Sequence, residues 1–422
     1  MERNIYDNYL TILKAELLPA MGCTEPIAVA FAAAKARAVL GKMPERMDMY
    51  CSGNIVKNVK GVVVPNSGGQ MGIDVAAVLG VVGGREDLEL EVVNSVTEEQ
   101  IEKTRELVKS GMCDCHLQEG EENLYIRAEV FAGEESAIVE VKTKHNHISR
   151  IEKNGKVLFS QDDLEAGSQG DKSKLNLKDI YEFANTVELE DVKPLMQRQL
   201  DYNEAIAKEG LANPWGSMVG QTLLEVNGDS DWRIKAKAMA AAGSDARMSG
   251  CALPVVINSG SGNQGITVSM PILVYAKKVG CSEEKMLRAL TLANLLSLHQ
   301  KRYIGNLSAY CGATSAGCSA ACGIAYIDGA SLDVIGHTII NAISTIGGMV
   351  CDGAKSSCAS KIASAVEAGL LGYELAKRNR SFKPGEGMVV EDMEQTIRNI
   401  GRMGREGMKS TDVEILNIML GK

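Results

Sequence analysis

The hydrophobic pattern of this chain changes its period along the sequence, and that change limits the folds open to it. Residues 5–40 have the pattern of two apolar helices. From about Met47 the apolar segments become short and rich in β-branched residues, and several alternate as strands do. After the polar, turn-rich stretch of residues 160–174, nearly every apolar segment has helical spacing as far as residue 378.

This pattern predicts a mainly α protein. We expect a helical domain, residues 1–44 and 166–422, that carries an inserted, smaller α+β domain, residues 45–165. In the smaller domain Asn154-Gly155 is a turn signal for a hairpin. Its expected strands are MDMYC, GVVVP, LELEVV, LYIRAEVF and SAIVEVKTKH, and its expected helices are GIDVAAVLGVVG and TEEQIEKTRELVKSG. The helices expected in the larger domain are residues 176–209, 231–249, 263–279, 282–299, 313–326, 330–347 and 356–378.

The composition favours close helix packing and argues against some partners. Aromatic residues make up only 4% of the chain, whereas glycine occurs 43 times, so helices can approach one another closely. The formal net charge of −9 argues against nucleic acid or an anionic membrane as a partner. The N-terminal residues lack the basic start and apolar run of a signal peptide, and the apolar runs are broken before about 18 residues. We therefore expect a cytoplasmic protein.

Eleven cysteines are many for a reducing compartment, where disulfides are uncommon. Five of them lie between Cys311 and Cys358. Cys318 and Cys322 sit among Ala, Ser and Gly at helical spacing, and one helix would separate Cys311 from Cys322 by roughly 16 Å. One small metal centre could not hold both ends of this row, so core packing is favoured for Cys318 and Cys322.

The other three cysteines of this stretch have different surroundings. Cys311 precedes Gly312 at the start of an expected helix, whose positive end favours a thiolate. Cys351 and Cys358 flank a short Asp-Gly-Ala-Lys-Ser-Ser loop. The sequence has no CxxC pairs, which zinc knuckles normally contain. Three thiolates without an obvious fourth suit an iron–sulfur cubane with one open iron, and three buried thiols remain the alternative.

Two Gly/Ser/Asn-rich loops resemble each other, PNSGGQMGID at residues 65–74 and NSGSGNQGI at residues 258–266. Each leads into an apolar helical pattern, so its backbone N–H groups and the helix N-terminus could hold an anion. Two ordinary glycine-rich turns are the alternative. His145 and His147 would share a face on a strand, as a binding pair or as solvated side chains.

Seven segments together resemble the L-cysteine desulfidase family, which is related to the α-chain of iron–sulfur L-serine dehydratases. They are MGCTEP (21–26), SGNIVKNV (52–59), VPNSGGQMGI (64–73), SDARMSG (244–250), NSGSGNQGI (258–266), IGNLSAYCGATSAGCSAACG (304–323) and GGMVCDGAKSSCASKIA (347–363). The resemblance implies a helical catalytic domain and a lyase that eliminates hydrogen sulfide from L-cysteine, giving pyruvate and ammonia. It implies that Cys311, Cys351 and Cys358 bind a [4Fe–4S] cluster with one open iron.

The resemblance also implies that Cys23 moves the α-proton, and Cys23 stands before a helix, where a thiolate is favoured. The small amino-acid substrate needs a cradle for its carboxylate. We expect this to come from Asn54, Asn58, Ser67, Gly68, Asn258, Ser259, Gly260, Gly262 and Asn263.

Several further expectations complete this interpretation. No pyridoxal phosphate signature is evident, and we expect a homodimer without nucleic-acid or membrane partners. The enzyme alternative is an L-serine dehydratase, which also gives pyruvate and ammonia. The non-enzyme alternative is a small-molecule-binding protein of the same fold. The dehydratase relatives can carry a C-terminal cysteine that reaches a cluster, and the ending IMLGK without one favours the desulfidase.

Overall fold

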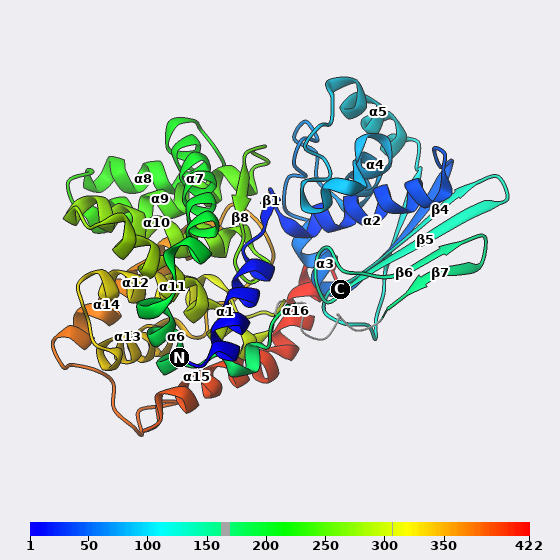
Figure 1. Cartoon of the computed structure of the whole chain (residues 1–422). Coiled ribbons are helices and arrows are strands. Elements are labelled where there is room, and N and C mark those ends of the chain that lie inside the picture. The colour runs from blue at the N-terminus through cyan, green and yellow to red at the C-terminus, as the bar shows by residue number, and fades with distance from the viewer. Residues whose placement is uncertain (162–168, 306) are drawn as a thin grey trace.

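The computed structural model describes residues 1–161, 169–305 and 307–422 and shows a large helical region beside a smaller region built on a sheet (Figure 1). The prediction of a mainly α protein is confirmed. The boundary expected at residues 165 and 166, residues 162–168 of the turn-rich stretch around it, and Asn306 lie outside the described residues. No helix in the described part of the chain is long and apolar enough to cross a membrane.

The helical region packs around α12 (Ala313–Ile327), which is buried along its whole length. Small residues let α14 approach it: a Cβ on Gly317 would lie 2.6 Å from the backbone of Ala365, and one on Gly369 would lie 2.5 Å from the Gly317 carbonyl oxygen. The other helices here are α1 (Arg3–Glu16), α6 (Leu177–Thr186), α7 (Leu189–Ala212), α8 (Val219–Asn227), α9 (Trp232–Met248), α10 (Gly262–Val279), α11 (Glu283–Ile304), α13 (Leu332–Ile346), α14 (Cys358–Lys377), α15 (Met393–Arg402) and α16 (Lys409–Leu420).

The smaller region contains a six-stranded sheet in the order β3-β2-β4-β5-β6-β7. β2 and β3 are parallel, and the other neighbours are antiparallel. The expected hairpin turn at Asn154-Gly155 joins β6 to β7, and both residues have positive φ. The strands are β2 (Arg46–Cys51), β3 (Cys113–Leu117), β4 (Tyr125–Ala132), β5 (Glu135–Lys142), β6 (Ile148–Lys153) and β7 (Lys156–Ser160). The helices of this region are α2 (Thr24–Leu40), α3 (Gly53–Val59), α4 (Ile73–Gly83), the 3₁₀ helix η1 (Glu86–Glu91) and α5 (Glu98–Lys109).

The packing of α2 differs from our expectation. Both N-terminal helices were expected in the helical domain, but only α1 packs there, against α7 and α11. α2 packs against β4, β5 and α4 instead (Figure 1). It is rich in alanine and buried on nearly every side, so its sequence lacks the polar face that would tell a sheet from a helix as its partner. We therefore propose that the smaller unit begins near residue 22 rather than at residue 45.

Two expected strands are not strands. GVVVP forms only a bridge from Val63 to Met71, and LELEVV begins inside η1 and continues as turns. Leu90, Val92 and Val93 of this segment are buried in the core, and η1 packs against α2. Tertiary packing has overridden strand propensity here.

Two short pairings join distant segments at the junction of the two regions. β1 (Pro19–Met21) pairs antiparallel with β8 (Pro254–Val256), so the chain before Cys23 runs beside the chain before Asn258. Tyr310 and Val350 form an isolated bridge between the segments that precede α12 and α14. These pairings hold together the four segments that carry the candidate site.

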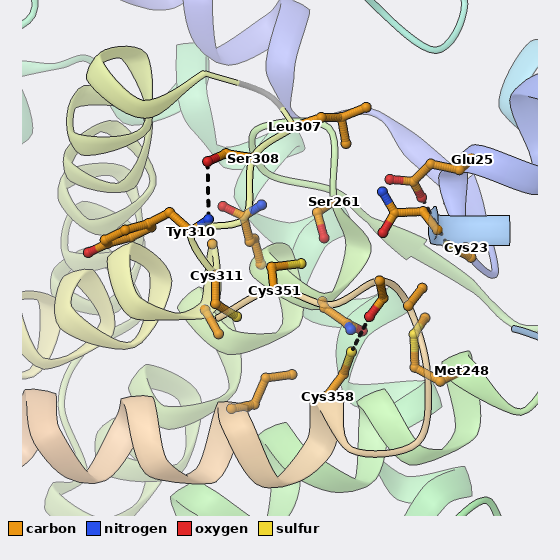
Figure 2. A pocket seen from close by; sticks show the side chains of 18 of the residues that line it. Cys23, Glu25, Met248, Ser261, Leu307, Ser308, Tyr310, Cys311, Cys351 and Cys358 are labelled. Atoms are coloured by element: carbon orange, nitrogen blue, oxygen red, sulfur yellow. Dashed lines mark hydrogen bonds between the residues drawn. The ribbon is translucent and has the colours of Figure 1, made fainter. Parts of the chain in front are cut away.

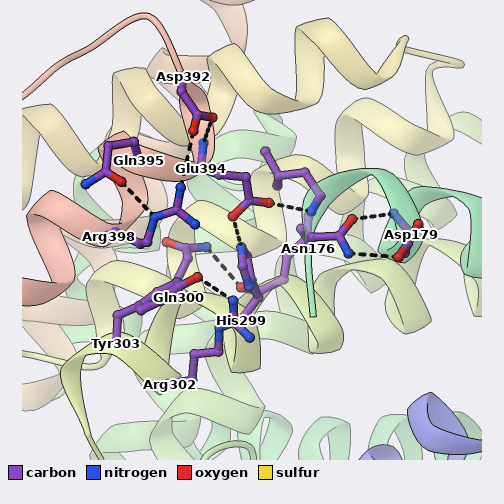
Figure 3. A network of polar contacts seen from close by, with 12 residues as sticks. Asn176, Asp179, His299, Gln300, Arg302, Tyr303, Asp392, Glu394, Gln395 and Arg398 are labelled. Carbon is purple, nitrogen blue, oxygen red and sulfur yellow. Dashed lines mark hydrogen bonds and ion pairs between the residues drawn. The ribbon is translucent and has the colours of Figure 1, made fainter. Parts of the chain in front are cut away.

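A buried polar network fixes the C-terminal half of α11 (Figure 3). His299 is fully buried, and its Nε2 lies 2.8 Å from Oε2 of Glu394 in α15. Oε1 of Glu394 accepts a hydrogen bond from the backbone N–H of Leu177, the first residue of α6 (2.7 Å). Because three helices meet at this carboxylate, the network holds α11 in place two residues before Lys301.

Candidate active site

One cavity at the junction of the two regions is lined by Cys23, Cys311, Cys351 and Cys358. Figure 2 shows Cys311, Cys351 and Cys358 around one part of this cavity, with Cys23 and Glu25 across from them at the start of α2. The structure thus brings together the four cysteines to which sequence analysis assigned chemistry.

Each of the three grouped thiols comes from a loop or a helix end. Cys311 lies two residues before α12, Cys351 lies in the loop before α14, and Cys358 is the first residue of α14. The Cys311 N–H donates to the Met349 carbonyl (2.9 Å), and the Cys351 N–H donates to the Ala309 carbonyl (2.6 Å). These backbone hydrogen bonds fix the spacing of the two loops.

Cys311 does not have the thiolate character expected at the start of a helix. Burial, followed by charge on Cys351, raises the pKa of Cys311 to about 12. The backbone N–H of Ala313 at the start of α12 acts in the expected direction and lowers this pKa, but burial outweighs it.

The donor set at this part of the cavity is three thiols. Within residues 1–161, 169–305 and 307–422, no group of three or more His, Cys, Asp or Glu side chains is arranged to hold a metal ion. Cys311, Cys351 and Cys358 line one cavity, and cysteine thiolates are the usual protein ligands of iron–sulfur clusters. Cys318 and Cys322, in contrast, are fully buried in α12 and point at carbonyls of α13, which confirms their core packing.

A buried lysine faces the same thiols. Lys301 is 4% exposed and lines the cavity. Burial lowers the pKa of Lys301 to about 8, while charge on Cys351 and Cys311 acts against that shift. A lysine ammonium here would offset negative charge on the thiolates.

Cys23 is a hydrogen-bonded thiol rather than the expected thiolate. It is 2% exposed and occupies the N-cap position of α2 without a capping hydrogen bond from its side chain, and its Sγ donates to Oε2 of Glu25 (2.9 Å). Burial, followed by the charge of Glu25, raises the pKa of Cys23 well above its ordinary value, although Arg247 acts in the opposite direction. The helix end therefore does not ionise this thiol, because burial and then the neighbouring carboxylate outweigh it.

A histidine lies beside Glu25. Nε2 of His145 lies 3.8 Å from Oε1 of Glu25, and both side chains are nearly buried. Although burial raises it, contacts with His145 and Cys23 lower the pKa of Glu25 to about 2. His145 lies in the turn between β5 and β6, whereas Nδ1 of His147 lies 3.0 Å from the carbonyl oxygen of Lys142, the last residue of β5. The two histidines therefore do not form the strand pair considered from the sequence.

Of the nine residues expected to bind substrate, only Asn58 and Asn263 line this cavity. Asn258 donates to Oδ1 of Asn294 in the core (2.9 Å), and Ser259 donates to Asn258 (3.0 Å). Gly260 accepts a hydrogen bond at its carbonyl, and Gly262 lies behind the lining residues.

The remaining three lie farther away. Ser67 exchanges hydrogen bonds with Gln70 inside its own loop, and Gly68 packs against α5. Asn54 donates to Asp412 of α16 (2.8 Å) and lines a neighbouring cavity. Asp412 also forms an ion pair with the buried Lys57, so α16 is tied to α3 beside the cysteine loop.

Sequence analysis missed four residues that line the site, and it did not foresee the contact of a fifth, His145, with Glu25. Glu25, Arg247 and Gln264 lie inside the quoted motifs MGCTEP, SDARMSG and NSGSGNQGI, so a closer search of those motifs could have found them. Lys301 has no comparable sequence signal. His145 was noticed, but its contact with Glu25 depends on tertiary structure.

Comparisons with known proteins show which proteins this chain is similar to. A family model described as "Serine dehydratase alpha chain" matches residues 87–417, which include the three grouped cysteines but not Cys23. A "UPF0597 protein" of Lachnoclostridium phytofermentans is 49% identical over 417 residues, covering 99% of this chain and all of that protein. UPF0597 proteins of Desulfitobacterium hafniense (49% over 426 residues, covering 100% and 99%) and Finegoldia magna (48% over 417 residues, covering 98% and 100%) are similar along their whole lengths. The names of these UPF0597 proteins state no activity.

Proposed function

We propose that this chain, which belongs to the family of the serine dehydratase alpha chain, is an iron–sulfur lyase that eliminates hydrogen sulfide from L-cysteine. Family membership indicates a serine dehydratase-like lyase, and the choice of L-cysteine is the finer proposal. The observation that carries it is the cavity in which Cys23 faces Cys311, Cys351 and Cys358. These thiols come from distant parts of the chain, and core packing alone gives no reason for them to line one cavity.

Cys311, Cys351 and Cys358 would hold a [4Fe–4S] cluster. When bound, such a cluster supplies a Lewis acid at an open iron, which takes the developing charge of a leaving sulfur without redox change. Lys301 adds positive charge beside the same thiols and strengthens their hold on a bound metal centre. The chain's own task is then to place the substrate and to move its α-proton.

Cys23 would move that proton from the opposite wall. Because it is a thiol at rest, it must lose its own proton before it can accept one from Cα. Oε2 of Glu25, 2.9 Å away, accepts the hydrogen bond of that thiol and holds it in place, and because the pKa of Glu25 is about 2 the thiol proton would leave to solvent rather than stay on this carboxylate. Loss of the α-proton and of the leaving group gives aminoacrylate, which hydrolyses to pyruvate and ammonia.

L-serine is the second candidate substrate, and the description of the matching family model favours it. Thiolate-ligated iron is soft and binds a substrate thiolate readily, whereas a serine hydroxyl has a much higher pKa and leaves less readily. The same cavity chemistry would serve either substrate, so steady-state kinetics must distinguish L-cysteine from L-serine. The test is to measure kcat/KM for both amino acids on one anaerobic preparation by following pyruvate. A higher value for serine would replace the proposed substrate.

The cluster is tested by iron and acid-labile sulfide analysis of anaerobically purified protein. Cys311→Ser, Cys351→Ser and Cys358→Ser should each lose the brown absorbance, because each removes a ligand. Cys281→Ser, outside the cavity, is the matched control, and Cys318→Ser tests the core assignment. Loss of cluster in Cys318→Ser with retention in Cys351→Ser would overturn the ligand assignment.

The non-catalytic alternative has its own outcome in these measurements. A protein with a full cluster that forms no pyruvate from either amino acid would be a binding protein of this fold. The homodimer stays a prediction, which light scattering after size-exclusion chromatography can test.

A further inference from the structure

Arg247 is a buried arginine that faces the cavity without a partner. It lies in the last turn of α9, is 2% exposed and lines the cavity. Its Nε has no hydrogen-bond partner, and its guanidinium forms no ion pair within the described residues. An arginine stays charged in proteins, and a buried charge without a partner is strongly unfavourable. The folded chain therefore keeps this guanidinium for something that is not part of the chain.

The chemistry of that partner follows from the guanidinium. Its planar fork of N–H donors matches a carboxylate, which it binds through two parallel hydrogen bonds. Space for the side chain is reserved, because a Cβ on Gly262 would lie 2.4 Å from Nε of Arg247. Arg247 lines the same cavity as Cys23 and Glu25.

The opposite charge is also available in that cavity. Glu25 lines the cavity as an ionised carboxylate, whose Oε1 lies 3.8 Å from Nε2 of His145 and whose Oε2 accepts a hydrogen bond from Cys23. Asn263 Oδ1 and Gln264 Oε1 are further buried acceptors without a partner, on residues that line the same space. A ligand ammonium would meet one carboxylate and two amide oxygens here.

We propose that Arg247 binds the α-carboxylate of the substrate and that Glu25, held by His145, binds its α-ammonium, so that the cavity selects zwitterionic α-amino acids. This inference rests on the proposed function, in which the substrate is a small amino acid. It moves carboxylate binding from the two glycine-rich loops to one arginine. The glycines of the second loop then serve to make room for that arginine.

This arrangement also explains how Cys23 becomes reactive. A substrate ammonium that contacts Glu25 offsets the negative charge beside the Cys23 thiol. The thiol then loses its proton more easily, and it does so only when an amino acid is bound. Arg247 and Glu25 are thus binding residues, and His145 is a positioning residue.

The test uses three ligands that do not react: L-alanine, propionate, which lacks the ammonium, and ethylamine, which lacks the carboxylate. Dissociation constants are measured by ligand-observed NMR on the cluster-loaded protein. The variants are Arg247→Met, Glu25→Gln and His145→Gln, with Arg247→Lys as the conservative rescue. Arg198→Met is the matched control, because its Nε is also buried without a partner but lies outside the cavity. Melting temperature and iron content show that each variant is folded and loaded.

Arg247→Met should weaken L-alanine at least thirtyfold and abolish propionate binding, but leave ethylamine within twofold of the wild type. Glu25→Gln should have the opposite effect: it should weaken the binding of L-alanine and ethylamine and leave propionate binding unchanged. Arg247→Lys should recover part of the propionate binding, and Arg198→Met should change nothing. His145→Gln should weaken ethylamine severalfold and spare propionate. Unchanged propionate binding in Arg247→Met, or equal loss of all three ligands, would overturn the inference.

Pyruvate formation on the same preparations separates this inference from the proposed function. Binding of L-alanine through Arg247 without any pyruvate from cysteine or serine keeps the inference and overturns the lyase. Pyruvate formation with KM unchanged in Arg247→Met keeps the lyase and overturns the inference.

Discussion

The two glycine-rich loops are nearly alike in sequence but not in their surroundings. NSGSGNQGI follows β8, which β1 fixes beside Cys23, and contributes Ser261, Asn263 and Gln264 to the cavity. PNSGGQMGI contributes no residue to it and bonds mainly to itself through Ser67 and Gln70. Similar composition therefore gives similar turns, while the segment paired in front of a loop decides what the loop faces.

The largest difference is expected when a methyl group is added to one glycine of each loop. Gly262→Ala would place a Cβ 2.4 Å from Nε of Arg247 and displace the guanidinium. We expect kcat/KM for L-cysteine to fall about 100-fold, because displacement of a binding group by about 1 Å costs this much. Gly69→Ala meets nothing within 4 Å, although its φ of 83° makes alanine unfavourable by roughly 1 kcal/mol.

Gly69→Ala should therefore melt slightly earlier and keep its kinetics. Iron content and melting temperature of Gly262→Ala show whether the protein remains folded and loaded. A kcat/KM within threefold of the wild type in folded Gly262→Ala would remove the distinction between the loops.

A smaller difference is expected at the asparagines. Asn263 lines the cavity with a buried Oδ1 that has no partner, whereas Nδ2 of Asn66 donates to the Val93 carbonyl (2.9 Å). Asn263→Ala should raise KM for L-cysteine about tenfold, because one hydrogen bond to a charged group contributes about 1.5 kcal/mol. Asn66→Ala should leave KM unchanged and lower the free energy of unfolding by about 1 kcal/mol. Steady-state kinetics and urea unfolding of both variants check this pair, and equal KM values in the two would contradict it.

These contrasts show how far the sequence could lead. Helical periodicity located most helices, and the spacing of Cys311, Cys318 and Cys322 separated a core pair from a cavity residue correctly. The partner of α2 could not be predicted, since an alanine-rich helix packs equally well on a sheet or on other helices. Local sequence also cannot show whether a buried arginine such as Arg247 forms a hydrogen bond or an ion pair, because its partner would come from distant segments.

A third comparison concerns how each loop is held from outside. Oγ1 of Thr24 donates to the Gly260 carbonyl (2.9 Å), and Nη2 of Arg105 donates to the Gly68 carbonyl (3.0 Å). Thr24→Val keeps the shape of the side chain but loses the hydrogen bond, so we expect kcat to fall about threefold as the cavity loop loosens. This corresponds to about 0.6 kcal/mol, within the range of a single neutral hydrogen bond. Arg105→Ala should leave kcat unchanged, and an equal loss in both variants would show that the loops act on the site together.

The smallest effects are expected at the serines, where the two loops should behave alike. Ser67 bonds only within its loop, and Ser259 donates to its neighbour Asn258. Neither residue lines the cavity, so Ser67→Ala and Ser259→Ala should each lower the free energy of unfolding by about 1 kcal/mol without changing KM. Urea unfolding and steady-state kinetics of both proteins measure this. An increase of KM in Ser259→Ala alone would mean that the second loop contacts substrate through this serine as well. An increase of KM in Ser67→Ala would instead indicate that the first loop belongs to the active site, because the Ser67 side chain could then affect KM only through contact with the substrate.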